Sequence, residues 1–161
     1  NIALTAIVVN NATYGMTGGQ YSPTTPLDAR TATAPYGHIE PAFRISELAV
    51  AAGASFVARS TVYHAEELQR YIAQAIEKDA FSMVEAVSYC HTTLGRMNRW
   101  GTAPQMMRRL KDTSITLKQA EGKTEEELQG KIVRGVLADR DLPTFRALYQ
   151  KIIERAQAEV E

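Results

Sequence analysis

The sequence contains a single cysteine, which excludes a scaffold held together by internal disulfides. It also lacks an excess of charge of either sign, because 18 Lys and Arg residues balance 18 Asp and Glu residues. This balance argues against a nucleic-acid binder that depends on bulk electrostatics and against a polybasic membrane-surface protein. The clean apolar run near the start covers only residues 6–9, far too short to cross a bilayer. We therefore expect a reducing, cytoplasmic setting, with neither nucleic acid nor a membrane as a partner.

The composition is that of one ordinary globular domain, with 161 residues of which 45% are apolar and 22% are charged. A chain of this length can bury a full core. Apolar periodicity predicts strands over residues 2–9, 55–58 and 81–87, and helices over residues 43–52 and 65–76. Strands that alternate with helices in this way are typical of an α/β fold with a parallel sheet.

The first predicted strand stands at the very start of the sequence. Residues 2–9 form a short run rich in β-branched side chains, which is typical of a strand buried on both faces of a parallel sheet. The chain opens with Asn1 rather than Met, and the usual flanking elements are missing before this strand. We interpret the chain as a fragment, or as a cleaved or split subunit. A native chain that happens to begin with a strand is the alternative.

The character of the sequence changes after Cys90. Residues 94–111 are basic and form either a solvated face or a docking surface for an acidic electron carrier. Residues 131–137 predict a short strand, and a last helix begins near Pro143, because proline suits the first turn of a helix. We expect an apolar stripe of this helix to pack on the domain. The stripe consists of Phe145, Leu148, Tyr149, Ile152, Ile153 and Ala156.

Residues 10–37 form a long irregular segment that directly follows the first strand. Open α/β sheets bind ligands at the carboxyl ends of their strands. Asparagine side chains in this segment offer neutral oxygen, a hard ligand suited to Mg²⁺, and Gly18 and Gly19 let backbone amides approach an anion closely. An Asn side chain and a backbone carbonyl two residues later could face one ion. Composition alone favours a plain turn built from turn-forming residues, because loops rich in Gly and Asn are common.

The run from Asn10 to Pro26 resembles the thiamine diphosphate-binding segment of the β subunit of 2-oxoacid:ferredoxin oxidoreductases, the relatives of 2-oxoglutarate synthase. The similarity continues through residues 53–59, 63–64, 88–92 and 95–98, resumes at residues 135–137 and reaches Pro143. The resemblance implies a three-layer α/β fold with a parallel sheet of the thiamine diphosphate-binding type. Residues 1–95 would be the C-terminal part of that domain, and residues 96–161 a C-terminal extension.

The resemblance also implies the residues of the cofactor site. The side chain of Asn11 and the backbone carbonyl of Thr13 would bind Mg²⁺, and Gly15, Met16 and Thr17 would lie against thiamine diphosphate. In the family a further Mg²⁺ ligand comes from an Asp in an upstream Gly-Asp-Gly motif, which this sequence lacks. Because Mg²⁺ demands nearly complete octahedral coordination, we expect this chain alone to bind the cofactor poorly.

Cys90 is the second candidate site residue. Taken alone, a single cysteine at the end of a strand is most often a small buried apolar side chain. The resemblance implies instead that Cys90 is the fourth thiolate ligand of a [4Fe–4S] cluster, which needs three more cysteines that this sequence does not contain. Tyr89 and His91 stand where the family has proline on either side of the cysteine.

The function implied by the resemblance is the oxidative decarboxylation of a 2-oxoacid, with 2-oxoglutarate favoured. Coenzyme A would take the acyl group, carbon dioxide would leave, and ferredoxin would accept the electrons. The activating carboxylate of the family comes from the partner α subunit, so no catalytic residue is assigned to this chain. Two alternatives remain open, namely a thiamine diphosphate enzyme without an iron-sulfur cluster and a non-catalytic subunit that serves assembly only.

Overall fold

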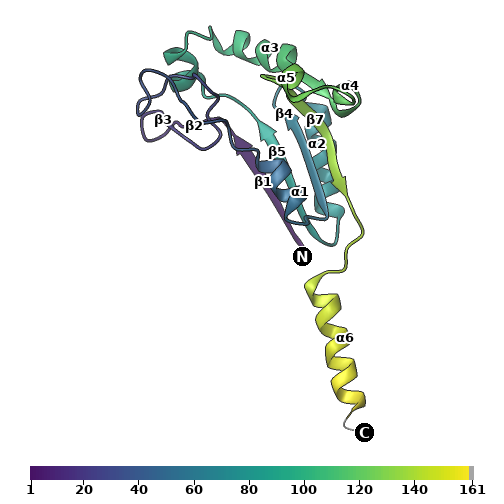
Figure 1. Cartoon of the computed structure of the whole chain (residues 1–161). Coiled ribbons are helices and arrows are strands. Elements are labelled where there is room, and N and C mark those ends of the chain that lie inside the picture. Colours follow the sequence, from purple (N-terminus) through teal and green to yellow (C-terminus); the bar gives the residue numbers. More distant parts are fainter. Residues whose placement is uncertain (160–161) are drawn as a thin grey trace.

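The computed structural model describes residues 1–159 and is built on a five-stranded sheet with the strand order β1-β5-β4-β7-β6 (Figure 1). The strands are β1 (Leu4–Asn10), β4 (Phe56–Thr61), β5 (Phe81–Val87), β6 (Ser114–Thr116) and β7 (Ile132–Asp139). Strands β1, β5 and β4 run parallel, as predicted, whereas β7 runs antiparallel to β4. The predicted α/β class is confirmed, with a sheet that is mostly parallel rather than wholly so.

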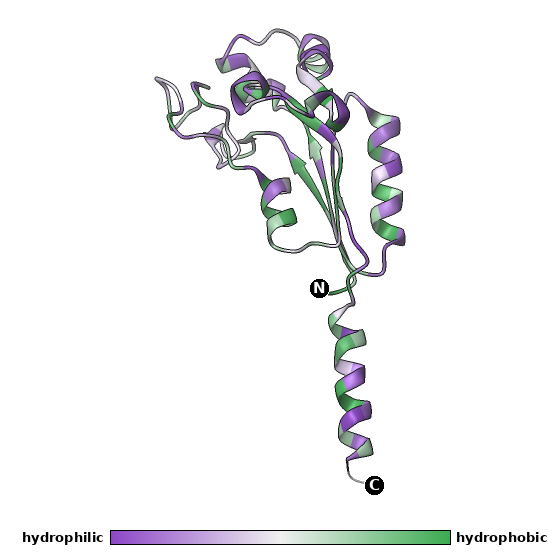
Figure 2. Cartoon of the chain, turned by 45° about the vertical axis from the view of Figure 1, so that its right-hand side comes forward, coloured by the Kyte–Doolittle hydropathy of each residue, from purple (hydrophilic) through white to green (hydrophobic). Residues whose placement is uncertain are grey.

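Helices α1 (Ile45–Ala51) and α2 (Ala65–Glu77) cover opposite faces of the sheet (Figure 2). Because side chains alternate along a strand, neighbouring residues of β4 enter different layers. Val57 packs on the α1 side, whereas Phe56 packs on the α2 side. The result is the predicted three-layer arrangement, with one apolar core on each face of the sheet.

Strand β1 lies at the edge of the sheet and hydrogen-bonds only to β5 among the described residues. Its side chains are therefore less buried than expected for a strand enclosed on both faces. Val9 is 67% exposed, and Leu4 and Ile7 are also exposed. The expectation that both faces of this strand are buried is wrong for the described chain, because no second strand flanks it there.

The part of the chain beyond residue 95 contributes to the same sheet. Residues 96–159 supply β6 and β7, and β7 includes the strand predicted over residues 131–137. Short helices lie near the carboxyl ends of the parallel strands (Figure 1). They are η1 (His91–Gly95), α3 (Ala103–Thr113), α4 (Leu117–Ala120) and α5 (Glu125–Leu128). The sheet therefore continues across the predicted boundary at residue 95.

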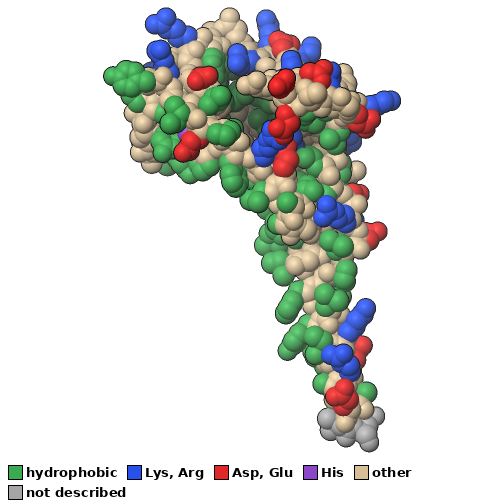
Figure 3. Space-filling view, in the orientation of Figure 1, with side chains coloured by type: hydrophobic (Ala, Val, Ile, Leu, Met, Phe, Trp, Pro, Cys, Tyr) green, Lys and Arg blue, Asp and Glu red, His purple; other side chains and the backbone are tan. Residues whose placement is uncertain are grey.

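The last helix, α6 (Phe145–Ala158), extends away from the sheet (Figure 1). All of its described side chains are exposed, and Figure 3 shows apolar side chains along one side of it. The expectation that this helix packs on the domain is therefore not met within the described chain, because no other described element lies beside the apolar stripe. Within residues 1–159, every helix falls short of the length or the apolarity that crossing a membrane requires.

Candidate functional site

The carboxyl ends of the three parallel strands lie next to one another. Val87 of β5 is in register with Asn10 of β1 on one side and with Thr61 of β4 on the other. The long segment after β1 and the segment after β5 therefore leave the sheet at neighbouring points (Figure 1). This edge is where open α/β sheets bind ligands, so the predicted location of the site agrees with the topology.

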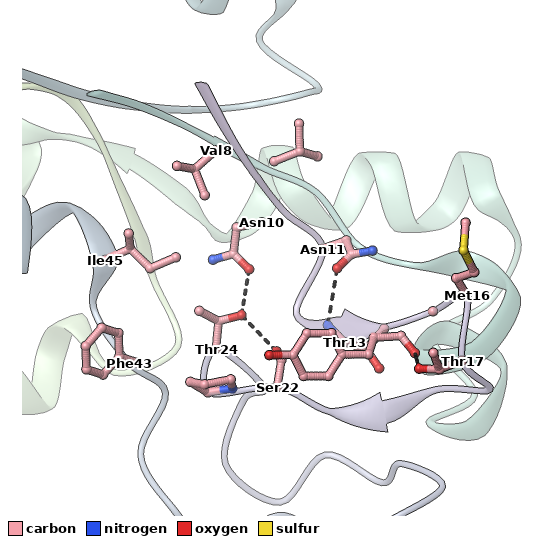
Figure 4. A pocket seen from close by; sticks show the side chains of 14 residues that line it. Val8, Asn10, Asn11, Thr13, Met16, Thr17, Ser22, Thr24, Phe43 and Ile45 are labelled. Carbon is pink, nitrogen blue, oxygen red and sulfur yellow. Dashed lines mark hydrogen bonds between the residues drawn. The ribbon is translucent and has the colours of Figure 1, made fainter. Parts of the chain in front are cut away.

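A cavity of ≈ 740 Å³ lies at the end of β1 (Figure 4). Its volume falls within the range of ligand and cofactor pockets. The wall is apolar where it is formed by β1 and the start of α1, and it carries polar side chains where it is formed by the loop. The lining residues are Val8, Val9, Asn10, Asn11, Thr13, Tyr14, Gly15, Met16, Thr17, Ser22, Pro23, Thr24, Phe43 and Ile45. All five residues of the predicted cofactor site are among them.

A sharp turn at Ala12 separates the two predicted Mg²⁺ ligands. Ala12 has a φ of 60°, a left-handed conformation that costs a residue with a Cβ roughly 1–2 kcal/mol. The turn is held because the Ala12 N–H donates to Asn10 Oδ1 at 3.1 Å and the Ala12 carbonyl accepts from Thr25 Oγ1 at 2.8 Å. It brings the side chain of Asn11 beside the backbone of Thr13. Such locally strained backbone is common at ligand sites.

The two neighbouring asparagines have different hydrogen-bonding environments. The oxygen of Asn10 is fully used, because it accepts both the Ala12 N–H and the Thr24 hydroxyl, while its Nδ2 donates to Glu85 Oε1 at 2.8 Å. The Oδ1 of Asn11 accepts only a long bond of 3.4 Å from the Thr13 N–H among the described residues (Figure 4). Asn11 thus keeps an oxygen available for a cation, whereas Asn10 does not. The donor set around Asn11 fits a hard ion such as Mg²⁺.

Gly15, Met16 and Thr17 lie in the turn between two short strands, β2 (Thr13–Tyr14) and β3 (Gln20–Tyr21). The side chain of Met16 is fully exposed at the tip of this turn, and the hydroxyl of Thr17 donates to the amide oxygen of Gln20. The turn is therefore folded by its own hydrogen bonds, with an apolar side chain at its tip.

Cys90 lies against this same turn. A Cβ added at Gly15 would meet the Sγ of Cys90 at 3.1 Å, so a side chain at this position would crowd the sulfur. Ala12, Ala29 and Leu94 form a small core on which Cys90 also packs. The segment after β1 and the segment after β5, which are distant in sequence, thus form one continuous structure around the site.

The thiol of Cys90 is surrounded by hydrogen-bond donors. Burial raises its pKa, but the hydroxyls of Thr92 and Thr93, at 3.2 and 3.0 Å from Sγ, and the N–H groups of Thr93 and Leu94 outweigh that effect and lower the pKa to about 7. A thiolate is the form that binds a metal, so this environment suits a ligand. Residues 1–159 contain no group of three His, Cys, Asp or Glu side chains that could hold a metal. Cys90 therefore fits one position of a four-thiolate cluster, and the described chain cannot complete it.

Glu85, Phe43 and Ile45 belong to the site region although the sequence did not predict them. Phe43 and Ile45 were predicted only as the start of a helix. They line the cavity because α1 packs against the face of the sheet next to the end of β1, which is a tertiary contact. Glu85 had a signal in the sequence, because it is the one charged residue within the apolar strand at residues 81–87. A charge inside a buried strand needs a specific partner.

Comparison with known proteins identifies a family. The model of the thiamine pyrophosphate enzyme, C-terminal TPP binding domain, matches residues 1–86 of this chain. That stretch includes β1, the loop with the Ala12 turn, both covering helices and most of β5, so it contains the whole predicted cofactor site except for the contact with Cys90.

Individual relatives are similar over most of this chain. The 2-oxoglutarate synthase subunit KorB of Methanocaldococcus jannaschii is 46% identical over 159 residues, which is 99% of this chain and 59% of the relative. The subunit of the same name from Archaeoglobus fulgidus is 53% identical over 92 residues, or 57% of this chain and 34% of the relative. Relatives that match nearly all of this chain are themselves much longer, so the chain spans little more than half of their length.

A solved structure has the same fold. It is the 2-oxoglutarate:ferredoxin oxidoreductase from Magnetococcus marinus with 2-oxoglutarate, coenzyme A and succinyl-CoA bound, and it superposes with a TM-score of 0.78 at 26% sequence identity. The match covers 98% of this chain and 54% of that chain.

Proposed function

Because this chain belongs to the thiamine pyrophosphate enzymes, whose C-terminal TPP-binding domain it carries, we propose that it forms the diphosphate-holding part of the β subunit of a 2-oxoacid:ferredoxin oxidoreductase. The proposed reaction is the oxidative decarboxylation of a 2-oxoacid with coenzyme A, which gives acyl-CoA and carbon dioxide and passes electrons to ferredoxin. The names of the relatives support 2-oxoglutarate as the substrate. A partner α subunit would be required for activity, and the cytoplasm is the proposed location.

The observation that carries this proposal is the available oxygen of Asn11 beside the Ala12 turn, in a cavity at the carboxyl end of β1. We assign the Asn11 side chain and the Thr13 carbonyl as two Mg²⁺ ligands, with Gly15, Met16 and Thr17 against the cofactor. Thiamine diphosphate, when bound, supplies the electron sink that decarboxylation of a 2-oxoacid needs. The task of these residues is to hold and orient its diphosphate through the ion, and the remaining Mg²⁺ ligands must come from the cofactor, from water and from other residues.

Replacing Asn11 by leucine in the complete enzyme tests this assignment. We expect Asn11→Leu to weaken the binding of thiamine diphosphate in the presence of Mg²⁺ by about 100-fold, because a directly bound oxygen is lost and even outer residues of metal sites are worth 10–100-fold. Isothermal titration calorimetry measures the effect. Asn11→Asp is the matched control and should retain binding, since a carboxylate oxygen is equally hard. Wild-type affinity in Asn11→Leu would show the assignment to be mistaken.

We further propose that Cys90 is one thiolate ligand of a [4Fe–4S] cluster whose other ligands lie outside these 161 residues. Its lowered pKa, the two threonine hydroxyls at its sulfur and the closeness of Gly15 support this role. A cluster at this position would lie next to the proposed diphosphate site, as a one-electron acceptor must.

Iron analysis of the complete enzyme distinguishes this proposal from its alternatives. We expect Cys90→Ala to lose iron and acid-labile sulfide and to stop reducing ferredoxin while still binding thiamine diphosphate. Ser88→Ala, two residues before the cysteine, leaves the thiol and both threonine hydroxyls in place and should keep the iron. A wild-type enzyme that decarboxylates without containing iron would favour a thiamine diphosphate enzyme that lacks a cluster. A wild-type complex that contains neither iron nor activity after reconstitution with its partners would favour a subunit that serves assembly only.

A further inference from the structure

Glu85 is a buried carboxylate in the middle of β5, and it is only 4% exposed. Burying a carboxylate is costly unless donors surround it. Three elements supply them. Asn10 of β1 donates its Nδ2 at 2.8 Å, Ser46 of α1 donates its hydroxyl, and Nη1 of Arg59 on β4 lies 3.8 Å away.

Arg59 is mainly engaged elsewhere. Its Nη1 and Nη2 donate to the two carboxylate oxygens of Glu47 at 3.0 Å each, and its Nε donates to the carbonyl of Val133 at 2.6 Å. Arg59 therefore balances the charge of Glu85 from a distance, and the direct hydrogen bonds to Glu85 come from Asn10 and Ser46. Through Asn10, the carboxylate of Glu85 is hydrogen-bonded to β1, the strand that ends at the proposed cofactor loop.

The chemistry of Glu85 determines which way the amide of Asn10 points. An ionised carboxylate only accepts hydrogen bonds, so the NH₂ group of Asn10 must face inward toward Glu85. The amide oxygen of Asn10 then faces the loop, where it accepts from the Ala12 N–H at 3.1 Å and from Thr24 Oγ1 at 2.8 Å. A reversed amide would set its NH₂ group against the Ala12 N–H, which can only donate.

We propose that Glu85 is a positioning residue for the diphosphate site: by orienting Asn10 it holds the left-handed turn at Ala12, which sets Asn11 beside Thr13. This inference rests on the proposed function, because it assumes that Asn11 and Thr13 bind the Mg²⁺. Glu85 itself does not line the cavity. Its effect reaches the ion through Asn10 and the turn.

The test measures the dissociation constant of Mg²⁺ at a fixed, saturating concentration of thiamine diphosphate in the complete enzyme. We expect Glu85→Leu, which removes the acceptor, to weaken Mg²⁺ binding 10–100-fold, as for outer residues of other metal sites. Glu85→Gln should restore binding to within a few-fold of wild type, because its amide oxygen can still accept from Asn10. Asn10→Ala should weaken binding as Glu85→Leu does, and combining the two should add little, since both act through the same contact.

Val84→Ala is the control for general destabilisation. Val84 is fully buried on the same strand but packs on the opposite face, away from the loop. The Val84→Ala variant should have a lower melting temperature than wild type and the same dissociation constant for Mg²⁺. If Glu85→Leu does not fold, the comparison of Asn10→Ala and Glu85→Gln with wild type carries the test.

The outcomes separate this inference from the proposed function. The role of Glu85 would be overturned if Glu85→Leu or Asn10→Ala left the Mg²⁺ affinity unchanged, or if the effects of the two substitutions were additive. If Asn11→Leu still bound weakly in that case, the proposed site would remain intact. Unchanged affinity in Asn11→Leu would overturn the proposed site and this inference with it.

Discussion

Ala12 shows how a single residue can organise a site without any reactive group. Its left-handed backbone is stabilised by one hydrogen bond at its N–H and another at its carbonyl. Its side chain is buried against Ala29 and Leu94. Glycine would adopt this conformation more easily, but it would lack the methyl group that packs there. The strain at Ala12 is therefore balanced by contacts from the loop itself, from Asn10 at the end of β1 and from Leu94 of η1.

His64, which precedes α2, makes stability depend on pH. Burial lowers its pKa below the ordinary 6.5, and the positive charge of Arg134 lowers it further. The folded protein thus binds a proton at His64 less readily than the unfolded chain, so folding is favoured above pH 6.5 and loses stability as the pH falls toward the lowered pKa. We expect the free energy of unfolding to decrease less steeply between about pH 7 and pH 5 in His64→Gln than in wild type.

Urea unfolding at several pH values measures this dependence. His91→Gln is the control, since it also removes one imidazole but from an exposed position in η1. Equal slopes for the wild type and His64→Gln would contradict the assignment of this pH dependence to His64.

At the scale of single elements, α6 differs from the helices that cover the sheet. Helices α1 and α2 each bury one face in a core, whereas the apolar stripe of α6 is exposed from Phe145 to Ile153. Within residues 1–159, α6 is attached at its start, where the Phe145 N–H donates to the Asn1 carbonyl at 2.6 Å. The side chain of Asn1 also donates to the carbonyls of Leu142 and Pro143, just before the helix.

Deleting the chain from Phe145 onward should leave the sheet folded. We expect the melting temperature to change by only a few degrees, because the deletion removes little buried apolar area from the described fold. We also expect less self-association in sedimentation experiments, because the exposed stripe is gone. A deletion from Ile132 onward is the contrasting variant and should unfold the protein, since it removes β7 and its pairing with β4. Loss of cooperative unfolding in the shorter deletion would contradict this view of α6.

At the scale of the whole molecule, the sheet brings together two segments that lie far apart in sequence. The turn that contains Gly15 meets Cys90 because β1 and β5 are hydrogen-bonded in register and end together. The buried group of Glu85, Asn10, Ser46 and Arg59 links β5, β1, α1 and β4 below that edge. A change in one of these four side chains would therefore be felt by the others, and through Asn10 by the turn at Ala12.

Local pattern was sufficient for much of the fold. The strands at residues 81–87 and near 131–137, the helix at residues 65–76 and the α/β class follow from apolar periodicity, which depends only on neighbours in the chain. The three-layer arrangement was implied by the family resemblance. The last helix was also predicted, but its packing was not, because an amphipathic stripe indicates that a face needs cover without specifying what covers it. The prediction that both faces of β1 are buried was wrong for a similar reason, because the sequence of a strand does not determine whether it lies at the centre or at the edge of the sheet.

The sequence by itself determined the segments that make up the candidate site, through the run from Asn10 to Pro26 and the position of Cys90. Only the tertiary structure decided that, within residues 1–159, the oxygen of Asn11 accepts a single long hydrogen bond whereas that of Asn10 accepts two, that Ala12 is the strained residue, and that Glu85 supports the turn from inside the sheet. The physical reason is that hydrogen bonds between distant segments distinguish two adjacent, chemically identical side chains, and such bonds exist only once the strands have been placed side by side.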